Sequence, residues 1–258
     1  MQDLALSLIQ TAIEPDNPEF NLKAYERWLV NAGDSDLVIL PEVFTTGFSA
    51  TARAHAEVEG GRAYQWLAHW AKKLDAVMTG SLVVREGSEY SNRLVWMRPD
   101  GSFTHYDKRH LFRMAGEHQR YRMGDQRLVV ELNGWRVLPL VCYDLRFPVW
   151  CRNQNDYDLA LFVANWPAAR ALHWQRLSQA RAIENLSYVA AVNRIGRDEK
   201  EQDYRGDSAV YGPAGEVLLD AASEEGRFSC VLSAERLTSY RQSFPAWMDA
   251  DDFELVRR

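Results

Sequence analysis

The stretch Val137-Leu138-Pro139-Leu140-Val141-Cys142 places a thiol directly after an uninterrupted apolar run. A short continuous run of this kind is typical of a strand that is covered on both faces. Just before it, Asn133-Gly134 is a strong signal for a two-residue turn between antiparallel strands. We therefore predict a hairpin of strands over 128–132 and 135–141, with Cys142 at the carboxyl end of the second strand.

Two other apolar runs end in a polar residue in the same way. Leu37-Val38-Ile39-Leu40-Pro41 precedes Glu42, and Leu159-Ala160-Leu161-Phe162-Val163-Ala164 precedes Asn165. In open α/β sheets, ligands bind beyond the carboxyl ends of the strands. The three polar side chains are therefore expected to converge on one crevice.

Helical patterns alternate with these strands along the chain. Apolar residues recur at helical spacing over 18–30, 62–74 and 168–185. Further strand patterns cover 4–9, 77–84, 94–97, 188–193, 208–211, 216–219 and 228–232. This alternation predicts a layered α/β fold. No linker rich in Pro, Gly or Ser divides the chain, so we expect one domain over 1–258, with a C-terminal extension from about residue 233.

The composition narrows the classes of partner. The chain has 258 residues, of which 47% are hydrophobic and 26% charged, as in an ordinary globular protein. A formal net charge of −6 does not favour nucleic acid as a partner. No apolar run approaches the roughly 20 residues that span a bilayer, and the first residues carry no basic leader. A cytoplasmic protein without a membrane partner is the expectation.

Three cysteines, Cys142, Cys151 and Cys230, occur without any Cys-x-x-Cys pair. Neither a disulfide framework nor a zinc ribbon is expected from them. A free cysteine is most often a small buried hydrophobe, and we assign that structural role to Cys151 in a helical turn and to Cys230 in the last strand. The six histidines show no metal-ligand spacing, so no metal site is expected.

Cys142 needs help to act as a nucleophile at neutral pH. The thiolate is the reactive form, and a free thiol with a pKa near 8.5 is mostly protonated. Glu42 could take the thiol proton. Lys108, which follows the turn and strand around residues 94–106, could supply a cation that stabilises the thiolate. Histidine is the commoner partner of a reactive cysteine, but neither His110 nor His173 follows a strand-like run.

Three motifs around these residues resemble the catalytic motifs of the nitrilase superfamily of carbon–nitrogen hydrolases. They are Leu40-Pro41-Glu42, Tyr106-Asp107-Lys108-Arg109-His110-Leu111-Phe112 and Val141-Cys142-Tyr143-Asp144-Leu145-Arg146-Phe147-Pro148. Their order and spacing agree with the superfamily, and the similarity extends from Leu4 to about Tyr240. Three motifs in the correct order are far more specific than any one of them.

The resemblance implies an αββα sandwich and a Glu–Lys–Cys triad. Glu42 is then the general base, Lys108 stabilises the tetrahedral intermediate, and Cys142 attacks the substrate. Glu117, in Gly116-Glu117-His118-Gln119, matches a second glutamate of the family and is expected to position Lys108 or Glu42. The resemblance implies no metal or organic cofactor. It also favours a homodimer, because members of the family commonly pair.

The segment Pro41-Glu42-Val43-Phe44-Thr45-Thr46-Gly47-Phe48 is most similar to the omega-amidase branch, which hydrolyses amides of short 2-oxo dicarboxylates. A small amide such as 2-oxoglutaramate is therefore the expected substrate. Arg146 follows the nucleophile by four residues, and its guanidinium would suit bidentate binding of a substrate carboxylate. A structural ion pair with Asp144 or another acid is the alternative, and the sequence does not choose between the two.

Four aromatic residues near the motifs are candidates for the pocket wall, with ordinary core packing as the alternative for each: Phe44, Tyr143, Phe147 and Trp166. The charged run Asp198-Glu199-Lys200-Glu201 is interpreted as a solvated loop.

Other functions remain open at this stage. A nitrilase, an N-carbamoyl hydrolase or an amidase of other small amides could use the same triad. A catalytically silent binding protein on the same fold and a thiol redox sensor based on Cys142 belong to different classes. The presence of all four expected catalytic residues argues against the silent binding protein.

Overall fold

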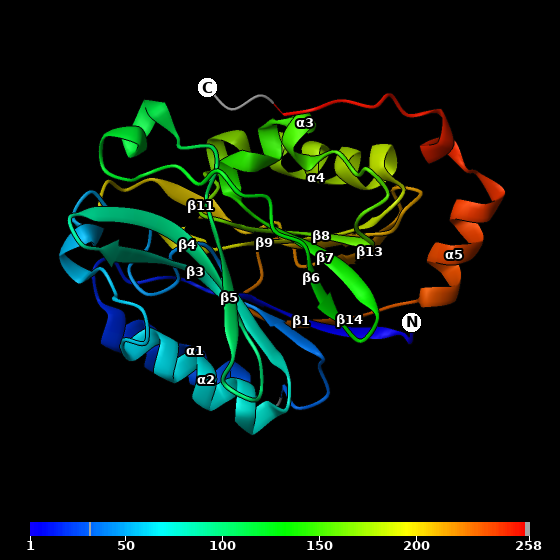
Figure 1. Cartoon of the computed structure of the whole chain (residues 1–258). Coiled ribbons are helices and arrows are strands. Elements are labelled where there is room, and N and C mark those ends of the chain that lie inside the picture. Colours follow the sequence, from blue (N-terminus) through cyan, green and yellow to red (C-terminus); the bar gives the residue numbers. More distant parts are fainter. Residues whose placement is uncertain (31, 256–258) are drawn as a thin grey trace.

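The computed structural model describes residues 1–30 and 32–255, so residue 31 and residues 256–258 of the expected domain lie outside the described part. Two six-stranded sheets face each other, and helices cover the outer face of each (Figure 1). Helices α1 (Pro18–Leu29) and α2 (Arg62–Leu74) lie on one side, and α3 (Pro148–Cys151) and α4 (Ala171–Asn185) on the other. The expected four-layer αββα sandwich is confirmed.

The first sheet carries the strands that lead to Glu42 and Lys108. Its order is β14-β1-β2-β3-β4-β5. The strands span Gly226–Leu232 (β14), Leu4–Gln10 (β1), Leu37–Ile39 (β2), Val77–Glu86 (β3), Glu89–Met97 (β4) and Phe103–Asp107 (β5). Strand β2 lies in the middle of this order, between β1 and β3. All three strands are parallel, so their carboxyl ends lie at the same edge of the sheet.

The second sheet carries the strand that leads to Cys142. Its order is β13-β12-β9-β8-β7-β6. The strands span Val217–Asp220 (β13), Ala209–Tyr211 (β12), Tyr188–Asn193 (β9), Leu159–Ala164 (β8), Trp135–Val141 (β7) and Val130–Leu132 (β6). Parallel pairing of β7, β8 and β9 places their carboxyl ends at one edge.

Continuous apolar runs are explained by the two cores that they serve. In β2, Leu37 and Ile39 point into the core between the two sheets, and Val38 points into the core beneath α1 and α2. Successive side chains of a strand alternate between its faces, so a strand with a core on each side must be apolar throughout. The turn between β6 and β7 has the positive φ angles of its predicted type, 51° at Asn133 and 82° at Gly134.

The helices begin and end where local chemistry dictates. Asn17 caps α1 by accepting the amide of Phe20 at 3.2 Å, and Pro18 occupies the first turn, where its missing N–H is not needed. The buried side of α1 is the stripe of Leu22, Tyr25 and Leu29. That stripe packs against the first sheet in the second core.

Four elements depart from the sequence-based expectation: β4, β10, β11 and α5. Strand β4 begins at Glu89, five residues before the predicted strand at 94, and pairs with β3 along its whole length. A small hairpin of β10 (Ile195–Arg197) and β11 (Asp203–Arg205) holds the charged run 198–201 at its tip. Residues beyond 233 include a helix, α5 (Ala234–Ser243), which stands at one end of the sandwich (Figure 1).

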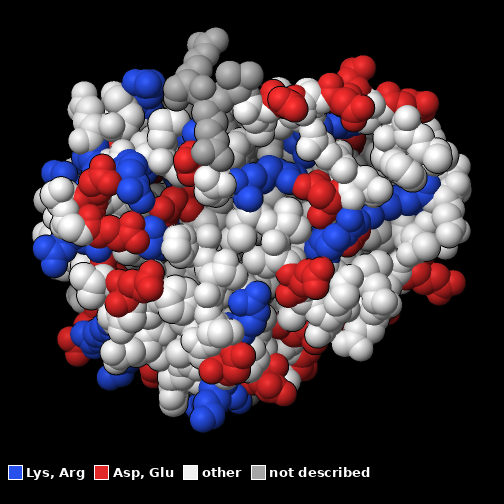
Figure 2. Space-filling model, in the orientation of Figure 1, with Lys and Arg blue, Asp and Glu red and all other residues white. Residues whose placement is uncertain are grey.

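Acidic and basic side chains are interspersed over the face of the molecule shown in Figure 2, in keeping with the modest net charge of −6. Among residues 1–30 and 32–255, no helix combines the length and the apolar character needed to cross a membrane.

Candidate active site

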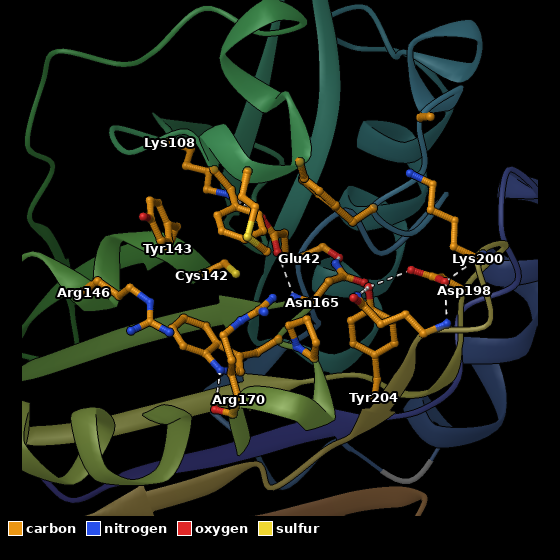
Figure 3. A pocket seen from close by; sticks show the side chains of 18 of the residues that line it. Glu42, Lys108, Cys142, Tyr143, Arg146, Asn165, Arg170, Asp198, Lys200 and Tyr204 are labelled. Carbon is orange, nitrogen blue, oxygen red and sulfur yellow. Dashed lines mark hydrogen bonds and ion pairs between the residues drawn. The ribbon is translucent and has the colours of Figure 1, made fainter. Parts of the chain in front are cut away.

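Cys142 begins a short 3-10 turn, η4 (Cys142–Arg146), immediately after β7. Its φ angle is +44°, a conformation that residues other than glycine rarely adopt. The strained bend turns the thiol away from the strand and into a cavity lined by the loops beyond the strand ends (Figure 3). Strain of this kind persists only where the surrounding structure enforces it, and it clusters at functional sites.

Lys108 follows β5 and is buried between two carboxylates. Its Nζ atom donates to Glu42 Oε1 at 2.9 Å and to both carboxylate oxygens of Glu117 at 3.0 Å. All three side chains are at most 1% exposed. Burial by itself would lower the pKa of Lys108, but the charges of Glu117 and Glu42 outweigh it and raise that pKa well above its usual value. Lys108 is therefore a permanent cation at neutral pH.

Glu42 is held by donors from both sheets. Asn92 Nδ2, in β4, donates to its Oε1 at 2.8 Å, and the backbone N–H of Asn165, after β8, donates to its Oε2 at 2.7 Å. The side-chain amide of Asn165 also donates to the Glu42 carbonyl at 2.5 Å. These contacts fix the orientation of the carboxylate that faces Cys142 (Figure 3).

The surroundings of Cys142 favour the protonated thiol over the thiolate. Burial, the negative charge of Glu42 and, more weakly, that of Glu117 raise its pKa well above the usual value, and the cation of Lys108 only partly offsets them. A thiol in this environment reacts only when a neighbouring group removes its proton during attack. The Glu42 carboxylate is the acidic side chain that the structure places beside the thiol.

Glu117 begins the 3-10 turn η3 (Glu117–Gln119) and connects Lys108 to the loop around it. One of its oxygens accepts the amide of Phe112 at 2.6 Å. Burial raises the pKa of Glu117, the Lys108 cation opposes that rise, and the charge of Glu42 adds to it. Glu117 therefore orients the lysine from the side opposite to Glu42.

A second buried carboxylate, Asp144, ties the nucleophile turn to the lysine loop. It accepts the Val141 amide at 3.0 Å and the Tyr106 hydroxyl at 2.8 Å. It also accepts the backbone amide of His110 at 2.9 Å, and its distance to His110 Nδ1 is 2.7 Å. With these partners Asp144 is not engaged by Arg146, so the structural alternative of an ion pair between these two residues is not observed.

The cavity in front of Cys142 has a volume of about 250 Å³ and combines aromatic walls with basic side chains. The aromatic residues are Phe48, Phe112, Tyr143, Trp166 and Tyr204. The basic residues are Lys108, Arg120, Arg146, Arg170 and Lys200. Glu42 and Asp198 are the acidic residues of the lining. A small anionic molecule with an apolar chain fits such a lining.

The structure brings three of the expected substrate-binding residues to this cavity: Tyr143, Arg146 and Trp166. The guanidinium of Arg146 lies over the Trp166 ring at 4.8 Å, and its Nη2 lies 2.9 Å from His173 Nδ1. Stacking on Trp166 orients the guanidinium, and His173 engages one of its terminal nitrogens.

The expectation that Phe44 and Phe147 wall the pocket is corrected by the structure. Phe44 is fully buried in the core beneath α1 and α2, where its ring packs edge-on against Tyr25. Phe147 stacks on His110 at 3.7 Å and faces a separate hollow behind the nucleophile turn.

Several site residues were not foreseen from the sequence. Asn92 lies in the polar half of β4, and Arg170 ends the 3-10 turn η5 (Ala168–Arg170). Asp198 and Lys200, interpreted as part of a solvated loop, line the cavity from the tip of the β10–β11 hairpin. Asn165, by contrast, was expected at this crevice, since it follows a buried strand as Glu42 does.

Comparison with known proteins adds to this geometry. Residues 6–243 match the model of the carbon–nitrogen hydrolase family. The chain is 47% identical to the omega-amidase YafV of Escherichia coli, over 99% of this chain and 100% of that protein. It is 33% identical to a 2-oxoglutaramate amidase of Bacillus subtilis, over 95% and 96% of the two chains. A solved CN-hydrolase superfamily protein of Xanthomonas campestris, with an arsenic adduct in its active site, has a TM-score of 0.98 and 47% identity, covering 99% of this chain and 100% of its own.

Proposed function

Since the chain belongs to the carbon–nitrogen hydrolase family, we propose that it is an omega-amidase, which hydrolyses the terminal amide of a short 2-oxo dicarboxylate monoamide such as 2-oxoglutaramate. One observation carries the proposal: a thiol and a lysine held between two carboxylates meet in a cavity with stacked arginines. The omega-amidase and 2-oxoglutaramate amidase relatives support this substrate class.

Attack begins with transfer of the thiol proton to Glu42. The Cys142 sulfur forms a bond to the amide carbon, and the carbonyl π electrons move to oxygen. Lys108 and the backbone N–H of Tyr143 stabilise that developing oxyanion. One donor of this kind contributes about 3–4 kcal/mol to the transition state. Since Lys108 remains charged, its contribution needs no proton transfer.

Collapse of the tetrahedral intermediate breaks the carbon–nitrogen bond. The leaving nitrogen takes the proton from Glu42 and departs as ammonia, which leaves a thioester on Cys142. Glu42, again a carboxylate, then removes a proton from water, and the hydroxide attacks the thioester carbon. The acid is released and the proton returns to the sulfur. Glu117 keeps Lys108 directed at the oxyanion through both halves of the reaction.

Arg146 is the residue that we assign to the substrate carboxylate. Its guanidinium stacks on Trp166 and lines the cavity (Figure 3). A fork of two parallel N–H donors suits a carboxylate better than a single ammonium does. Tyr143 and Trp166 then enclose the short chain between the carboxylate and the amide.

We also propose a single hydrolase domain with a C-terminal extension, assembled as a cytoplasmic homodimer. Three free thiols suit a reducing compartment. Phe244 and Met248, both in the extension, are 56% and 68% exposed, which suits burial against a second copy. Light scattering of the full chain on a sizing column measures its mass directly.

Ammonia release tests the proposed reaction. The full chain is assayed with 2-oxoglutaramate, glutamine, asparagine, a nitrile and an N-carbamoyl amino acid, with Cys142→Ala as the inactive control. We expect the highest kcat/KM for 2-oxoglutaramate. A higher value for the nitrile or the N-carbamoyl amino acid would replace the proposal with one of the related activities.

A further inference from the structure

Arg170, at the end of η5, and Arg146, at the end of η4, both line the cavity that Cys142 faces (Figure 3). The Arg170 guanidinium lies over the ring of Phe112 at 5.4 Å. Among the described residues, no carboxylate forms an ion pair with it, and its side chain forms no hydrogen bond. By contrast, Arg93, which is buried elsewhere, is paired with Asp107 and Glu86. Arg170 is thus oriented by stacking while its charge is left available.

The two acids of the cavity lining are already engaged. Glu42 accepts hydrogen bonds from Lys108, Asn92 and Asn165. Asp198 accepts the Tyr204 hydroxyl at 3.1 Å and the backbone amides of Lys200 and Gln202 at 2.9 and 3.0 Å. The space around Arg146 and Arg170 is therefore rich in donors and carries excess positive charge.

We propose that Arg170 recognises the 2-oxo group of the substrate and excludes a 2-ammonium group from the same position. This inference rests on the omega-amidase function proposed above. It makes Arg170 the residue that determines the preference of the enzyme for 2-oxo acid amides. Arg146 binds the carboxylate, and Arg170 binds the 2-oxo oxygen.

The chemistry of the two substrate types explains the selection. A 2-oxo acid presents only acceptors along its oxygen edge, and these match the N–H donors of two guanidinium groups. Glutamine has the same chain length and the same amide, but at carbon 2 it carries an ammonium group, which has donors only. Placed between two arginines, that cation meets repulsion from both guanidinium groups.

Three amides of equal chain length separate these contributions. 2-Oxoglutaramate carries the oxo group, glutaramate has a methylene in its place, and glutamine has the ammonium. Ammonia release is measured for the unaltered chain, Arg170→Gln, Arg170→Lys and Arg176→Gln. Arg176 is exposed on α4 and does not line the cavity, so its variant is a matched control for the loss of one positive charge.

For Arg170→Gln we expect kcat/KM for 2-oxoglutaramate to fall roughly tenfold to a hundredfold, the range for a lost hydrogen bond to a charged group. The value for glutaramate should change by less than about threefold, and the value for glutamine should be unchanged or higher. Arg170→Lys keeps the charge but not the fork, so it should lose activity on 2-oxoglutaramate and still reject glutamine. Arg176→Gln should behave as the unaltered chain.

An equal loss on 2-oxoglutaramate and glutaramate would overturn the inference, since Arg170 would then bind only the carboxylate. No loss on either substrate would overturn it as well. Both results leave the omega-amidase proposal intact, because the unaltered chain still prefers 2-oxoglutaramate. If the unaltered chain does not hydrolyse 2-oxoglutaramate, the proposed function itself fails and the inference with it. Thermal melting of each variant separates a loss of fold from a loss of selectivity.

Discussion

The backbone N–H of Asn165 donates to Glu42 Oε2 at 2.7 Å, although the two residues follow strands of different sheets. Glu42 comes after β2 in the first sheet, and Asn165 comes after β8 in the second. The base of the proposed reaction is therefore oriented by the sheet that carries the nucleophile. The geometry of the site thus depends on how the two sheets pack against each other.

Asn165→Ala should lower kcat about tenfold while KM changes little. The backbone donor to Oε2 remains, but the side-chain bond to the Glu42 carbonyl is lost. About 1.4 kcal/mol of transition-state stabilisation corresponds to that factor. Steady-state ammonia release measures it, and an unchanged kcat would show that the side chain does not hold the base in place.

Glu117→Gln should lower kcat by about two to three orders of magnitude, the effect of misplacing a donor to an oxyanion. The substitution is isosteric and removes one of the two carboxylates that orient Lys108. The comparison is with Glu89→Gln, an exposed site on β4, which should keep full activity. A large rise in KM with kcat unchanged would instead place Glu117 in substrate binding.

Glu42→Gln should produce a thiol that ionises more easily in an enzyme that no longer turns over. The negative charge of Glu42 raises the pKa of Cys142, so its removal lowers that pKa. The midpoint of iodoacetamide alkylation at Cys142, followed by mass spectrometry of the peptide, should move to lower pH. Movement to higher pH would contradict the arrangement of charges described here.

Arg241→Met should detach α5 and lower the free energy of unfolding by about 1–3 kcal/mol. Arg241 donates to Asp158 Oδ1 at 2.6 Å and to the carbonyls of Tyr157 and Leu186 at 2.8 Å. Burial opposes the ionisation of Asp158, but Arg136 and Arg241 outweigh it and lower its pKa. The stability from this contact is therefore present above the ordinary carboxyl pKa and is lost as the pH falls through the lowered value.

Urea titrations at pH 7 and at about pH 3 check this prediction. The difference between the Met variant and the unaltered chain should shrink at the lower pH, where Asp158 begins to take up a proton. A difference that grows on acidification would contradict the assigned contact.

Phe44→Leu should affect stability and leave substrate choice unchanged. Its ring lies in the core beneath α1 and α2, where a Cβ atom added to Gly80 would come within 2.9 Å of it. Loss of part of a closely packed ring costs about 1–3 kcal/mol. Chemical unfolding measures that loss. A changed ratio of kcat/KM between 2-oxoglutaramate and glutamine would show that Phe44 contributes to substrate binding.

The sequence predicted best those elements that bury apolar residues on a regular period. Strands β8 and β9 and helix α2 span the residues that their patterns indicated. The first half of β4, by contrast, consists mostly of polar residues. These residues form a strand because they pair with β3 and because their side chains bind residues distant in sequence. Arg93 pairs with Asp107 and Glu86, and such tertiary pairs leave no periodic signal.

The same distinction applies to the site. Glu42, Lys108, Glu117 and Cys142 were located because motifs and strand ends point to them. Asn92 and Arg170 were not, because one asparagine in a strand and one arginine in a short turn carry no pattern of their own. Phe44 was misplaced because Val43, with a φ angle of +44°, turns the chain so that the ring enters the core.

Strand β14 pairs residues 226–232 with residues 4–10 of β1, at nearly the full sequence distance that the described chain allows. During synthesis, β1 leaves the ribosome early, and its outer edge then waits unpaired while more than two hundred residues are added. At about 5–20 residues per second that wait lasts roughly 10–45 s. A newly made chain thus contains Glu42, Lys108 and Cys142 before β14 completes the first sheet. Over that interval the outer edge of β1 is open to pairing with another strand.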